Sequence, residues 1–254
     1  MTNPLTPGQL TGARALITGS SRGIGAKTAE YLADAGASVV INYRNKEARA
    51  QKLVESIEAS GGTAIAVGAD LTDPVGVARM MGSIKERWGG LDLLILNASG
   101  GMEADMGEDY AMKLNRDAQV GLLMSALPLM ERGARVVFVT SHQAHFIREV
   151  ETMPEYVPVA LSKRAGEDAL RGMNDQMKSL GIDFVVVSGD MIEGTVTATL
   201  LNRANPGVID QRKEQVGKLY NVDEFAAEVA LAAVEDIPDD HTRLVGDISS
   251  FQTS

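Results

Sequence analysis

Short apolar runs rich in Val and Ile alternate along this chain with longer stretches of helical periodicity. The runs predict strands at residues 14–18, 38–42, 63–67, 92–96, 135–140, 182–187 and 242–245. Helices are expected at residues 23–35, 46–59, 74–88, 109–131, 159–180 and 222–234. This alternation is typical of repeated βαβ units, whose parallel strands are covered on both faces. The sequence therefore predicts an α/β fold, a doubly wound parallel sheet of about seven strands with helices on both faces.

Two connections between the predicted elements are long, at residues 141–158 and 188–220. The other loops are short, so residues 1–254 are expected to form a single domain. Both long segments follow strands, and an open parallel sheet binds its ligands beyond the carboxyl ends of its strands. We therefore expect the substrate pocket there, with a lid near residues 188–220.

The composition excludes several functions. There is no cysteine, which rules out disulfides, thiolate catalysis and cysteine-bound metals, so redox chemistry would need a bound cofactor. The formal net charge of −10 opposes binding to nucleic acid or to an anionic membrane. No apolar run approaches the roughly 18 residues of a membrane span, and the first residues lack the features of a secretory signal. We expect a cytoplasmic protein without a nucleic-acid or membrane partner.

A glycine-rich turn follows the first predicted strand and leads into an alanine-rich helix. Glycines allow a tight turn and a close approach to a pyrophosphate, whose charge is met by free N–H groups at the helix N-terminus. A glycine cluster alone is weak evidence, but this one has the required strand before it and helix after it. The sequence predicts a Rossmann-type dinucleotide site, formed here by Gly19, Ser21, Arg22, Gly23, Ile24 and Gly25.

The motif Thr-Gly-x-x-x-Gly-x-Gly, from Thr18 to Gly25, resembles the signature of the short-chain dehydrogenase/reductase family. Further similarities follow in register as far as Ile192, which is expected to line the cofactor. The pair Asp70-Leu71 resembles the residues that touch the adenine ring, and Asn97-Ala98-Ser99-Gly100 is similar to the segment Asn-Ala-x-Gly that lines the cofactor. Asn115 falls where the family places an asparagine that kinks a helix and holds a water of the proton relay.

The choice between NAD and NADP depends on the end of the second predicted strand, Ile41-Asn42-Tyr43-Arg44. An NAD enzyme carries an Asp or Glu there to bind the ribose 2′-hydroxyl, whereas a 2′-phosphate needs cations. Arg44 and Arg22 could clamp one phosphate, a task suited to the guanidinium group. Either arginine could instead be an exposed solubilising charge. The missing acid and the arginine pair favour NADP(H).

The resemblance implies a catalytic Tyr, a Lys four residues later that lowers the tyrosine pKa, and a Ser that holds the substrate oxygen. Ser141 follows the fifth predicted strand and Lys163 lies in the next helix, where both match the family. Val159 stands at the tyrosine position and has no proton to give. The usual Tyr-x3-Lys pair is therefore absent.

Tyr156 lies seven residues before Lys163, and this Tyr-x6-Lys spacing resembles the divergent branch that contains enoyl-acyl-carrier-protein reductases. Seven residues turn a helix by about 700°, so both side chains can share one face. The segment Ser188-Gly189-Asp190, where most of the family has Pro-Gly, adds to that likeness. We expect Tyr156, Lys163, Ser141 and Asn115 to be catalytic, although Tyr156 could be a rim aromatic and Ser141 a strand cap.

These features predict hydride transfer from NADPH to a carbonyl or conjugated enoyl group of a small molecule or acyl thioester. Two other classes stay open: a catalytically degenerate or regulatory NADP-binding protein, and a non-redox enzyme on the same scaffold. The family resemblance also implies a homodimer or homotetramer formed through the helices at residues 109–131 and 159–180.

Two further groups of residues stand near the expected pocket. His142 and His145 lack a third ligand, so no metal site is expected, and they are interpreted as pocket lining or solvated loop residues. Five methionines could form an adaptable apolar pocket or simply fill gaps. They are Met102, Met106, Met112, Met153 and Met191.

Overall fold

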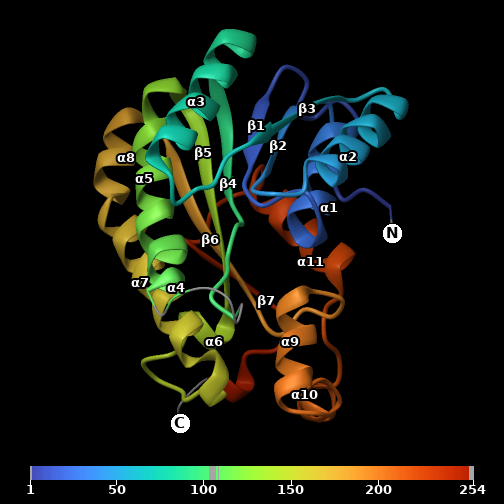
Figure 1. Cartoon of the computed structure of the whole chain (residues 1–254), viewed down its shortest axis with the longest axis vertical. Coiled ribbons are helices and arrows are strands. Elements are labelled where there is room, and N and C mark those ends of the chain that lie inside the picture. The colour runs from blue at the N-terminus through green and yellow to red at the C-terminus, as the bar shows by residue number, and fades with distance from the viewer. Residues whose placement is uncertain (1, 103–106, 108, 252–254) are drawn as a thin grey trace.

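The computed structural model describes residues 2–102, 107 and 109–251. Its centre is a sheet of seven parallel strands in the order β3-β2-β1-β4-β5-β6-β7 (Figure 1). The strand order reverses between β1 and β4, which confirms the predicted doubly wound α/β fold. The strands are β1 (Arg14–Ile17), β2 (Ser38–Tyr43), β3 (Thr63–Gly68), β4 (Leu91–Leu96), β5 (Met130–Ser141), β6 (Asp183–Gly189) and β7 (Thr242–Val245).

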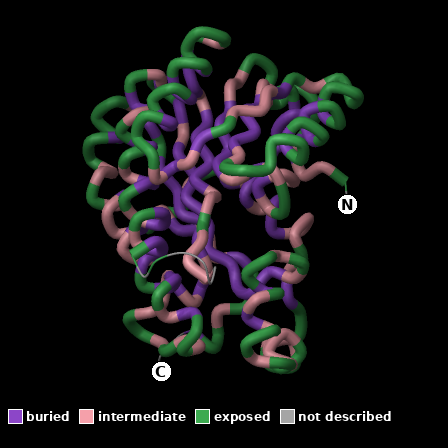
Figure 2. Tube along the Cα trace, in the orientation of Figure 1, coloured by how far each residue is buried: buried purple, intermediate pink, exposed green. Residues whose placement is uncertain are grey.

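Helices cover both faces of the sheet, as Figure 1 shows. One face carries α1 (Gly23–Asp34), α2 (Glu47–Ala59) and α11 (Val222–Ala232). The other carries α3 (Pro74–Trp88), α5 (Ala118–Ala126), α7 (Val157–Gly172) and α8 (Asn174–Leu180). The strands at the centre are buried, while the outer sides of the helices are exposed (Figure 2).

The period of two in the strands separates two cores. In β1, Ala15 and Ile17 pack into the core beneath α1 and α11, whereas Leu16 packs into the core on the opposite face. Each side chain is completely buried. Because both faces are covered, the strands read as continuous apolar runs without polar alternation.

Local sequence signals set the ends of several helices, and α3 shows them well. The Asp73 carboxylate accepts hydrogen bonds from the backbone N–H groups of Val75 and Gly76. Pro74 occupies the first turn, where its missing N–H costs nothing, and Gly89 ends the helix with φ of 77°.

The predicted helix at residues 109–131 is divided in the structure. It consists of α4 (Tyr110–Met112), a π-helical turn (Lys113–Asp117), α5 and a 3₁₀ turn (Leu127–Leu129), after which β5 begins. The 3₁₀ turn contains Pro128, which lacks the N–H that would continue an α-helix. The predicted helix at residues 159–180 is likewise two helices, α7 and α8, separated at Met173.

Both long connections contain helices that sequence periodicity did not reveal. The first holds α6 (His142–His145) and a 3₁₀ turn (Pro154–Tyr156), and the second holds α9 (Val196–Ala204) and α10 (Val208–Val216). Figure 1 shows α6, α9 and α10 beyond the ends of β5 and β6, where the pocket and lid were expected. Within the described part of the chain, no helix has the length and apolar character needed to cross a membrane.

Candidate active site

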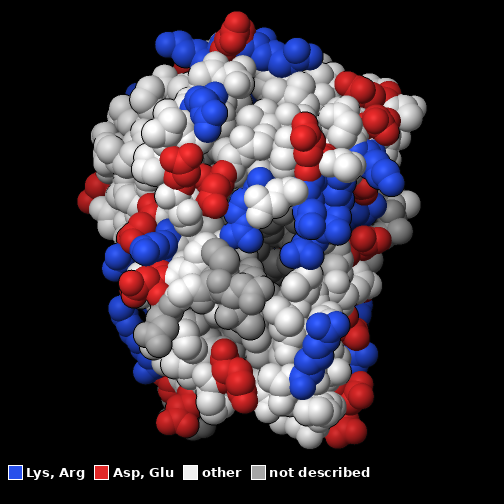
Figure 3. Space-filling view, viewed as in Figure 1, with Lys and Arg blue, Asp and Glu red and all other residues white. Residues whose placement is uncertain are grey.

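A cavity of about 560 Å³ lies beyond the carboxyl ends of the strands. The glycine turn after β1 forms one end, and Ser141, Tyr156 and residues of the lid form the other. Figure 3 shows the region as a hollow with Lys and Arg side chains beside its mouth. With the exceptions of Gly25 and Asn115, every residue predicted to bind cofactor or to act in catalysis lines this cavity.

The turn between β1 and α1 is built by glycine backbone geometry. Gly19 and Gly23 have φ of 61° and 59°, a region that side chains disfavour. A Cβ at Gly25 would lie 2.6 Å from the Asn97 Nδ2 atom and 2.9 Å from the Ser20 Cα atom. Gly25 therefore contributes close packing behind the turn, while Gly19 and Gly23 line the cavity itself.

The N-terminus of α1 faces this turn without a side-chain cap. Arg22 is the N-cap residue, in an extended conformation, and its side chain makes no capping bond. Uncapped N–H groups and the positive end of the helix dipole suit a diphosphate. Asn42 steadies the turn from β2, because its Oδ1 atom accepts from the Gly19 N–H at 3.1 Å.

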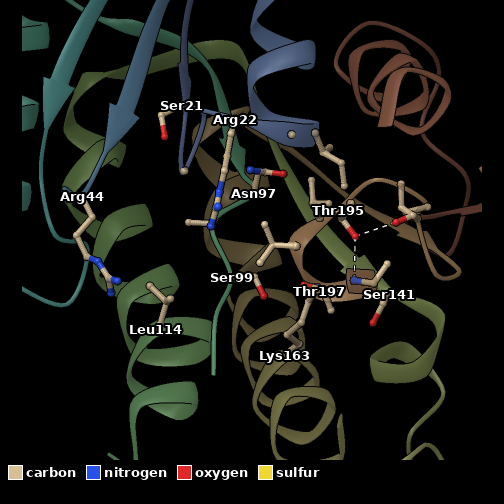
Figure 4. Close-up of a pocket in the computed structure, with 18 of the residues that line it drawn as sticks. Ser21, Arg22, Arg44, Asn97, Ser99, Leu114, Ser141, Lys163, Thr195 and Thr197 are labelled. Atoms are coloured by element: carbon tan, nitrogen blue, oxygen red, sulfur yellow. Dashed lines mark hydrogen bonds between the residues drawn. The ribbon is translucent and has the colours of Figure 1, made fainter. Parts of the chain in front are cut away.

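Four cations line the end of the cavity beside β2: Arg22, Arg44, Lys46 and Arg49. In Figure 4, Arg22 and Arg44 extend into the cavity from neighbouring segments. The Arg44 guanidinium donates to the Tyr110 hydroxyl and lies 5.6 Å from the centre of that ring. The sequence analysis did not predict Lys46 and Arg49 as site residues. Their position shortly after Arg44 could have indicated a larger basic cluster.

The residues expected around the adenine and the middle of the cofactor are held by backbone contacts. Asp70 accepts from the Thr72 N–H at 2.9 Å, which fixes the loop after β3. Asn97 donates from Nδ2 to the Thr18 carbonyl at 2.9 Å, and the Thr18 hydroxyl accepts from the Asn97 N–H. The loops after β1 and β4 are thereby joined at one wall of the cavity, to which Leu71, Ala98 and Ile192 also contribute.

At the other end, the Ser141 Oγ atom lies 3.1 Å from the Tyr156 hydroxyl. Ser141 ends β5 and is the N-cap of α6, where its Oγ accepts from the Ala144 N–H at 3.3 Å. Tyr156 comes from the 3₁₀ turn before α7 and is 4% exposed, so the ring is buried and not at a rim. Lys163 reaches the same cavity from α7 (Figure 4).

Burial dominates the titration of both groups. It raises the pKa of Tyr156 above its ordinary value, against the lowering effect of the Ser141 hydrogen bond. Burial lowers the pKa of Lys163 to about 8, and the charge of Glu167 opposes that change. At neutral pH the cavity is therefore lined by a neutral phenol and an ammonium, which is the combination of an acid and a cation that proton transfer to a substrate oxygen requires.

Glu167 forms a buried support on α7 one turn beyond Lys163. Its carboxylate is 2.9 Å from both the His145 Nδ1 and the Arg171 Nε atoms. Burial opposes its ionisation, but His145 and Arg171 outweigh burial, so the pKa of Glu167 lies below its ordinary value. The His145 contact attaches α6, and with it the segment after Ser141, to the helix that carries Lys163.

Asn115 lies in the π-helical turn and contacts the site indirectly. Its Nδ2 atom donates to the Gly100 carbonyl at 2.8 Å and to the Ser162 hydroxyl at 2.9 Å. A Cβ at Gly166 would lie 2.0 Å from the Asn115 carbonyl oxygen. The distorted helix and α7 are therefore in direct backbone contact beside Lys163.

The interpretation of the two histidines as pocket lining or solvated loop residues was wrong, because both are structural. His142 is completely buried, with Nδ1 2.8 Å from the Ser188 hydroxyl and Nε2 3.1 Å from the Val245 carbonyl. The carbonyl can only accept, so Nε2 carries the proton and Nδ1 accepts from Ser188. His145 is 14% exposed, does not line the cavity, and contacts the buried Glu167 carboxylate.

Of the five methionines interpreted as either pocket lining or gap-fillers, only some lie near the site. Met191 is buried in an apolar cluster with Tyr156, and Met102 and Met153 pack against it. Met112 belongs to α4, and Met106 lies outside the described residues. Two polar residues of the cavity, Gln143 and Asp190, were not singled out as site residues, because the contact that joins them spans 47 residues.

The profile of the family described as "short chain dehydrogenase" matches residues 13–205. A short chain dehydrogenase/reductase of Aspergillus aculeatus is 34% identical over 203 residues, 78% of this chain and 74% of that protein. A 1-cyclohexenylcarbonyl-CoA reductase of Streptomyces collinus is 34% identical over 186 residues, 70% of this chain and 64% of that protein. The solved structure of an angucycline C-6 ketoreductase with bound NADP is 30% identical, covers 91% of this chain and 92% of that chain, and has a TM-score of 0.75.

A parallel sheet with a glycine turn at its switch point and a Ser, Tyr and Lys around the far end of the cavity defines a dinucleotide-dependent oxidoreductase. The chain belongs to the short-chain dehydrogenase family and is an NAD(P)-dependent reductase, homologous to NADP-bound ketoreductases. The site fits such a cofactor, because any Cβ at Gly25 would disrupt the turn and the first N–H groups of α1 have no side-chain cap.

Proposed function

We propose that this protein reduces a ketone to an alcohol with NADPH. The observation that carries the proposal is the 3.1 Å contact between the Ser141 and Tyr156 hydroxyls in the cavity that Lys163 also lines. Two hydroxyls this close can donate to one carbonyl oxygen. A carbonyl oxygen that becomes an alkoxide is the group such a pair stabilises.

The residues of this chain supply the proton and the polarising contacts, and bound NADPH supplies the hydride. Tyr156 donates its phenolic proton to the oxygen as the carbonyl carbon gains the hydride, so a ketone, NADPH and a proton yield an alcohol and NADP⁺. Its raised pKa keeps the phenol protonated at neutral pH. Lys163 stabilises the tyrosinate that forms, and Asn115 positions Lys163 through the contact of its helix with α7.

The preference for NADPH is supported by the cations beside β2. Arg22, Arg44, Lys46 and Arg49 line the cavity, and no carboxylate lines it at that end within the described residues apart from Asp70. Asp70 bonds to Thr72 and follows β3, not β2. A 2′-phosphate would be attracted to these cations, whereas a 2′-hydroxyl gains little from them.

A second candidate function is reduction of a conjugated enoyl thioester. Two observations favour it: the Tyr-x6-Lys spacing and the similarity to a 1-cyclohexenylcarbonyl-CoA reductase. In that reaction hydride goes to the β-carbon, and Tyr156 stabilises an enolate at the thioester oxygen. A regulatory NADP-binding protein would use the same cofactor cavity without turnover, and a non-redox enzyme would turn over without consuming NADPH.

The test is NADPH consumption with cyclic ketones and with cyclohexenylcarbonyl thioesters, using the parent, Tyr156→Phe and Ser141→Ala. For ketone reduction we expect kcat to fall about 1,000-fold in Tyr156→Phe and 10–100-fold in Ser141→Ala, with little change in NADPH affinity. Tyr31→Phe is the matched control, because Tyr31 is equally buried but lies on α1 away from the cavity.

Turnover of thioesters but not ketones, with Ser141→Ala as active as the parent, would replace the first function by the second. NADPH binding without turnover of either panel would indicate the regulatory alternative. Normal ketone turnover in Tyr156→Phe would refute the proposed mechanism.

We also propose that the protein forms a homodimer or homotetramer through α5 and α7. Met124 on α5 and Leu161 on α7 are each 49% exposed, and an interface through these two helices would bury both side chains. The double variant Met124→Lys, Leu161→Lys should sediment as a monomer. Its melting temperature should be lower than that of the parent, because the interface no longer stabilises the fold. Unchanged sedimentation would place the interface elsewhere.

A further inference from the structure

Asp190 follows β6 and forms a buried junction between three segments of the site. Its side chain is 8% exposed. One carboxylate oxygen accepts from the Gln143 Nε2 atom at 2.7 Å and from the Met191 N–H at 2.8 Å, and the other accepts from the Arg212 Nε atom at 2.7 Å. Neither the dinucleotide turn nor the Ser, Tyr and Lys group accounts for this arrangement.

The junction determines which way the Gln143 amide points. A carboxylate offers only acceptors, so the amide nitrogen must face Asp190 and the amide oxygen must point away from it. Gln143 lies two residues after Ser141 and lines the same cavity. Among the described residues, the Gln143 Oε1 atom has no hydrogen-bond partner. The amide oxygen is therefore held as an acceptor in the cavity that the Ser141 and Tyr156 side chains also line.

The surroundings of Gln143 show what kind of group it would meet. The lid side of the cavity is lined by Met191, Val196, Ala198 and Leu201, which suit the apolar body of a substrate, with Thr195 and Thr197 between them. An acceptor amid such residues is matched by a single donor on the ligand, since an unpaired polar group there would cost binding. On a ketone substrate, the group most often available to donate such a hydrogen bond is a hydroxyl elsewhere on the molecule.

We infer, building on the proposed ketone reduction, that Gln143 accepts a hydrogen bond from a substrate hydroxyl, so that ketones hydroxylated near the reacting carbonyl are preferred. Asp190 is the positioning residue that holds the amide in this orientation. Arg212 connects this selection to the lid, because it lies on α10 and is only 12% exposed where it contacts Asp190. Its guanidinium also donates to the Ser250 hydroxyl at 2.8 Å, which attaches the lid to the C-terminal segment.

The experiment compares tetralone with its singly hydroxylated derivatives, with NADPH as reductant. The parent should favour at least one hydroxylated derivative about tenfold in kcat/KM, the effect of one well-placed hydrogen bond. Gln143→Leu should bring that ratio close to one, mainly through a higher KM for the hydroxylated ketone. Asp190→Asn should lower the ratio about threefold, because an asparagine can donate as well as accept and lets the Gln143 amide turn.

Lys213→Ala is the matched control for the lid. Lys213 lies next to Arg212 on α10 and pairs with Glu193 at 2.6 Å without contacting Asp190. It should leave the ratio between the ketones at the parent value. Circular dichroism melting of each variant separates loss of folding from loss of selectivity, and Gln143→Leu tests the inference even if Asp190→Asn does not fold.

The inference is overturned if the parent reduces these ketones without preferring any hydroxylated member, or if Gln143→Leu keeps the parent ratio. Either result leaves the proposed ketone reduction intact. If the parent reduces no ketone at all, the proposed function fails first, and the inference fails with it.

Discussion

The two ends of the cavity are held together in different ways. At the cofactor end, the shape of the site is set by backbone geometry. Gly19 and Gly23 adopt positive φ, and the uncapped N-terminus of α1 faces the turn. At the reaction end, the shape of the site is set by side chains from distant segments. Gln143, for example, bonds to Asp190, which lies 47 residues away in the sequence. A site formed by backbone geometry is encoded by a short sequence motif. A site formed by side chains from distant segments exists only once the whole chain has folded.

This difference suggests that the two ends tolerate change differently. In the glycine turn a side chain is costly for two reasons: a Cβ at Gly25 would collide with Asn97 and Ser20, and Gly19 and Gly23 have a positive φ that side chains disfavour. A group assembled from side chains can lose one member and still fold, but its chemistry changes. Four variants test this contrast.

The largest effect is expected from Lys163→Met at the reaction end. Removing the ammonium should lower kcat for reduction about 1,000-fold, because the tyrosinate loses its cation. The same variant should be more stable at pH 7 by on the order of 2–3 kcal/mol, since methionine ends the cost of burying a charge whose pKa is lowered to about 8. Enzyme kinetics and urea unfolding measure the two effects.

The sign of the pH dependence follows from the same group. The folded chain gives up the Lys163 proton near pH 8, whereas the unfolded chain keeps it to about 10.5. The cost of the buried ammonium is thus fully present below pH 8 and is relieved as pH rises towards 10.5. Parent kcat/KM should fall above about pH 8 while the stability difference between parent and variant shrinks. Lys178→Met, an exposed lysine on α8, should show neither change.

The second effect, at the cofactor end, is expected from Gly25→Ala. The added methyl would meet the Asn97 side chain and the Ser20 backbone, so we expect a loss of about 1–3 kcal/mol in stability and at least about 100-fold in NADPH affinity. Gly82→Ala is the control, because no atom lies within 4 Å of a Cβ there and the site is inside α3. That substitution should stabilise the protein by about 0.5–1 kcal/mol. Comparable losses in both variants would contradict the contrast.

A smaller effect is expected from Arg44→Ser. Loss of one of four cations should weaken NADPH binding about tenfold and leave NADH binding almost unchanged, since only NADPH carries the 2′-phosphate. Titration calorimetry with both nucleotides measures the difference. Lys52→Ser removes an exposed charge of α2 that does not line the cavity, and it should affect neither nucleotide. Equal weakening of both nucleotides by Arg44→Ser would place the phosphate elsewhere.

The smallest effect is expected where the lid meets the turn that carries Tyr156. The Asn205 Nδ2 atom, just after α9, donates to the exposed Glu155 carboxylate at 3.1 Å. Asn205→Ala should raise KM about 2–3-fold and leave kcat nearly constant, because exposed contacts contribute little. Glu155→Gln keeps an acceptor and should behave as the parent. A large fall in kcat would show that this contact positions Tyr156.

The sequence predicted the fold and the cofactor end because their signals are local. The strand, glycine turn and helix from Arg14 to Asp34 follow one another directly, and apolar runs show which strands are buried. The reaction end was predicted in part. Tyr156, Lys163 and Ser141 could be proposed from spacing, and the structure brings all three to one cavity.

The remaining features could not be read from spacing. The pairing of Asp190 with Gln143 and Arg212, and of His142 with Val245, depends on which strands lie beside each other. Such contacts follow from the sheet order, which a periodicity argument does not supply. The π-helical turn at Asn115 was likewise hidden, because its residues read as ordinary helix.

His142 is completely buried directly after Ser141. Burial lowers the pKa of this imidazole to about 4, so it remains neutral from mild acid to alkali. The residue next to Ser141 thus adds no charge to the reaction end when the surroundings become acidic. The imidazole that follows Ser141 in the chain thus acts as an uncharged link between β6 and β7, through Ser188 and Val245.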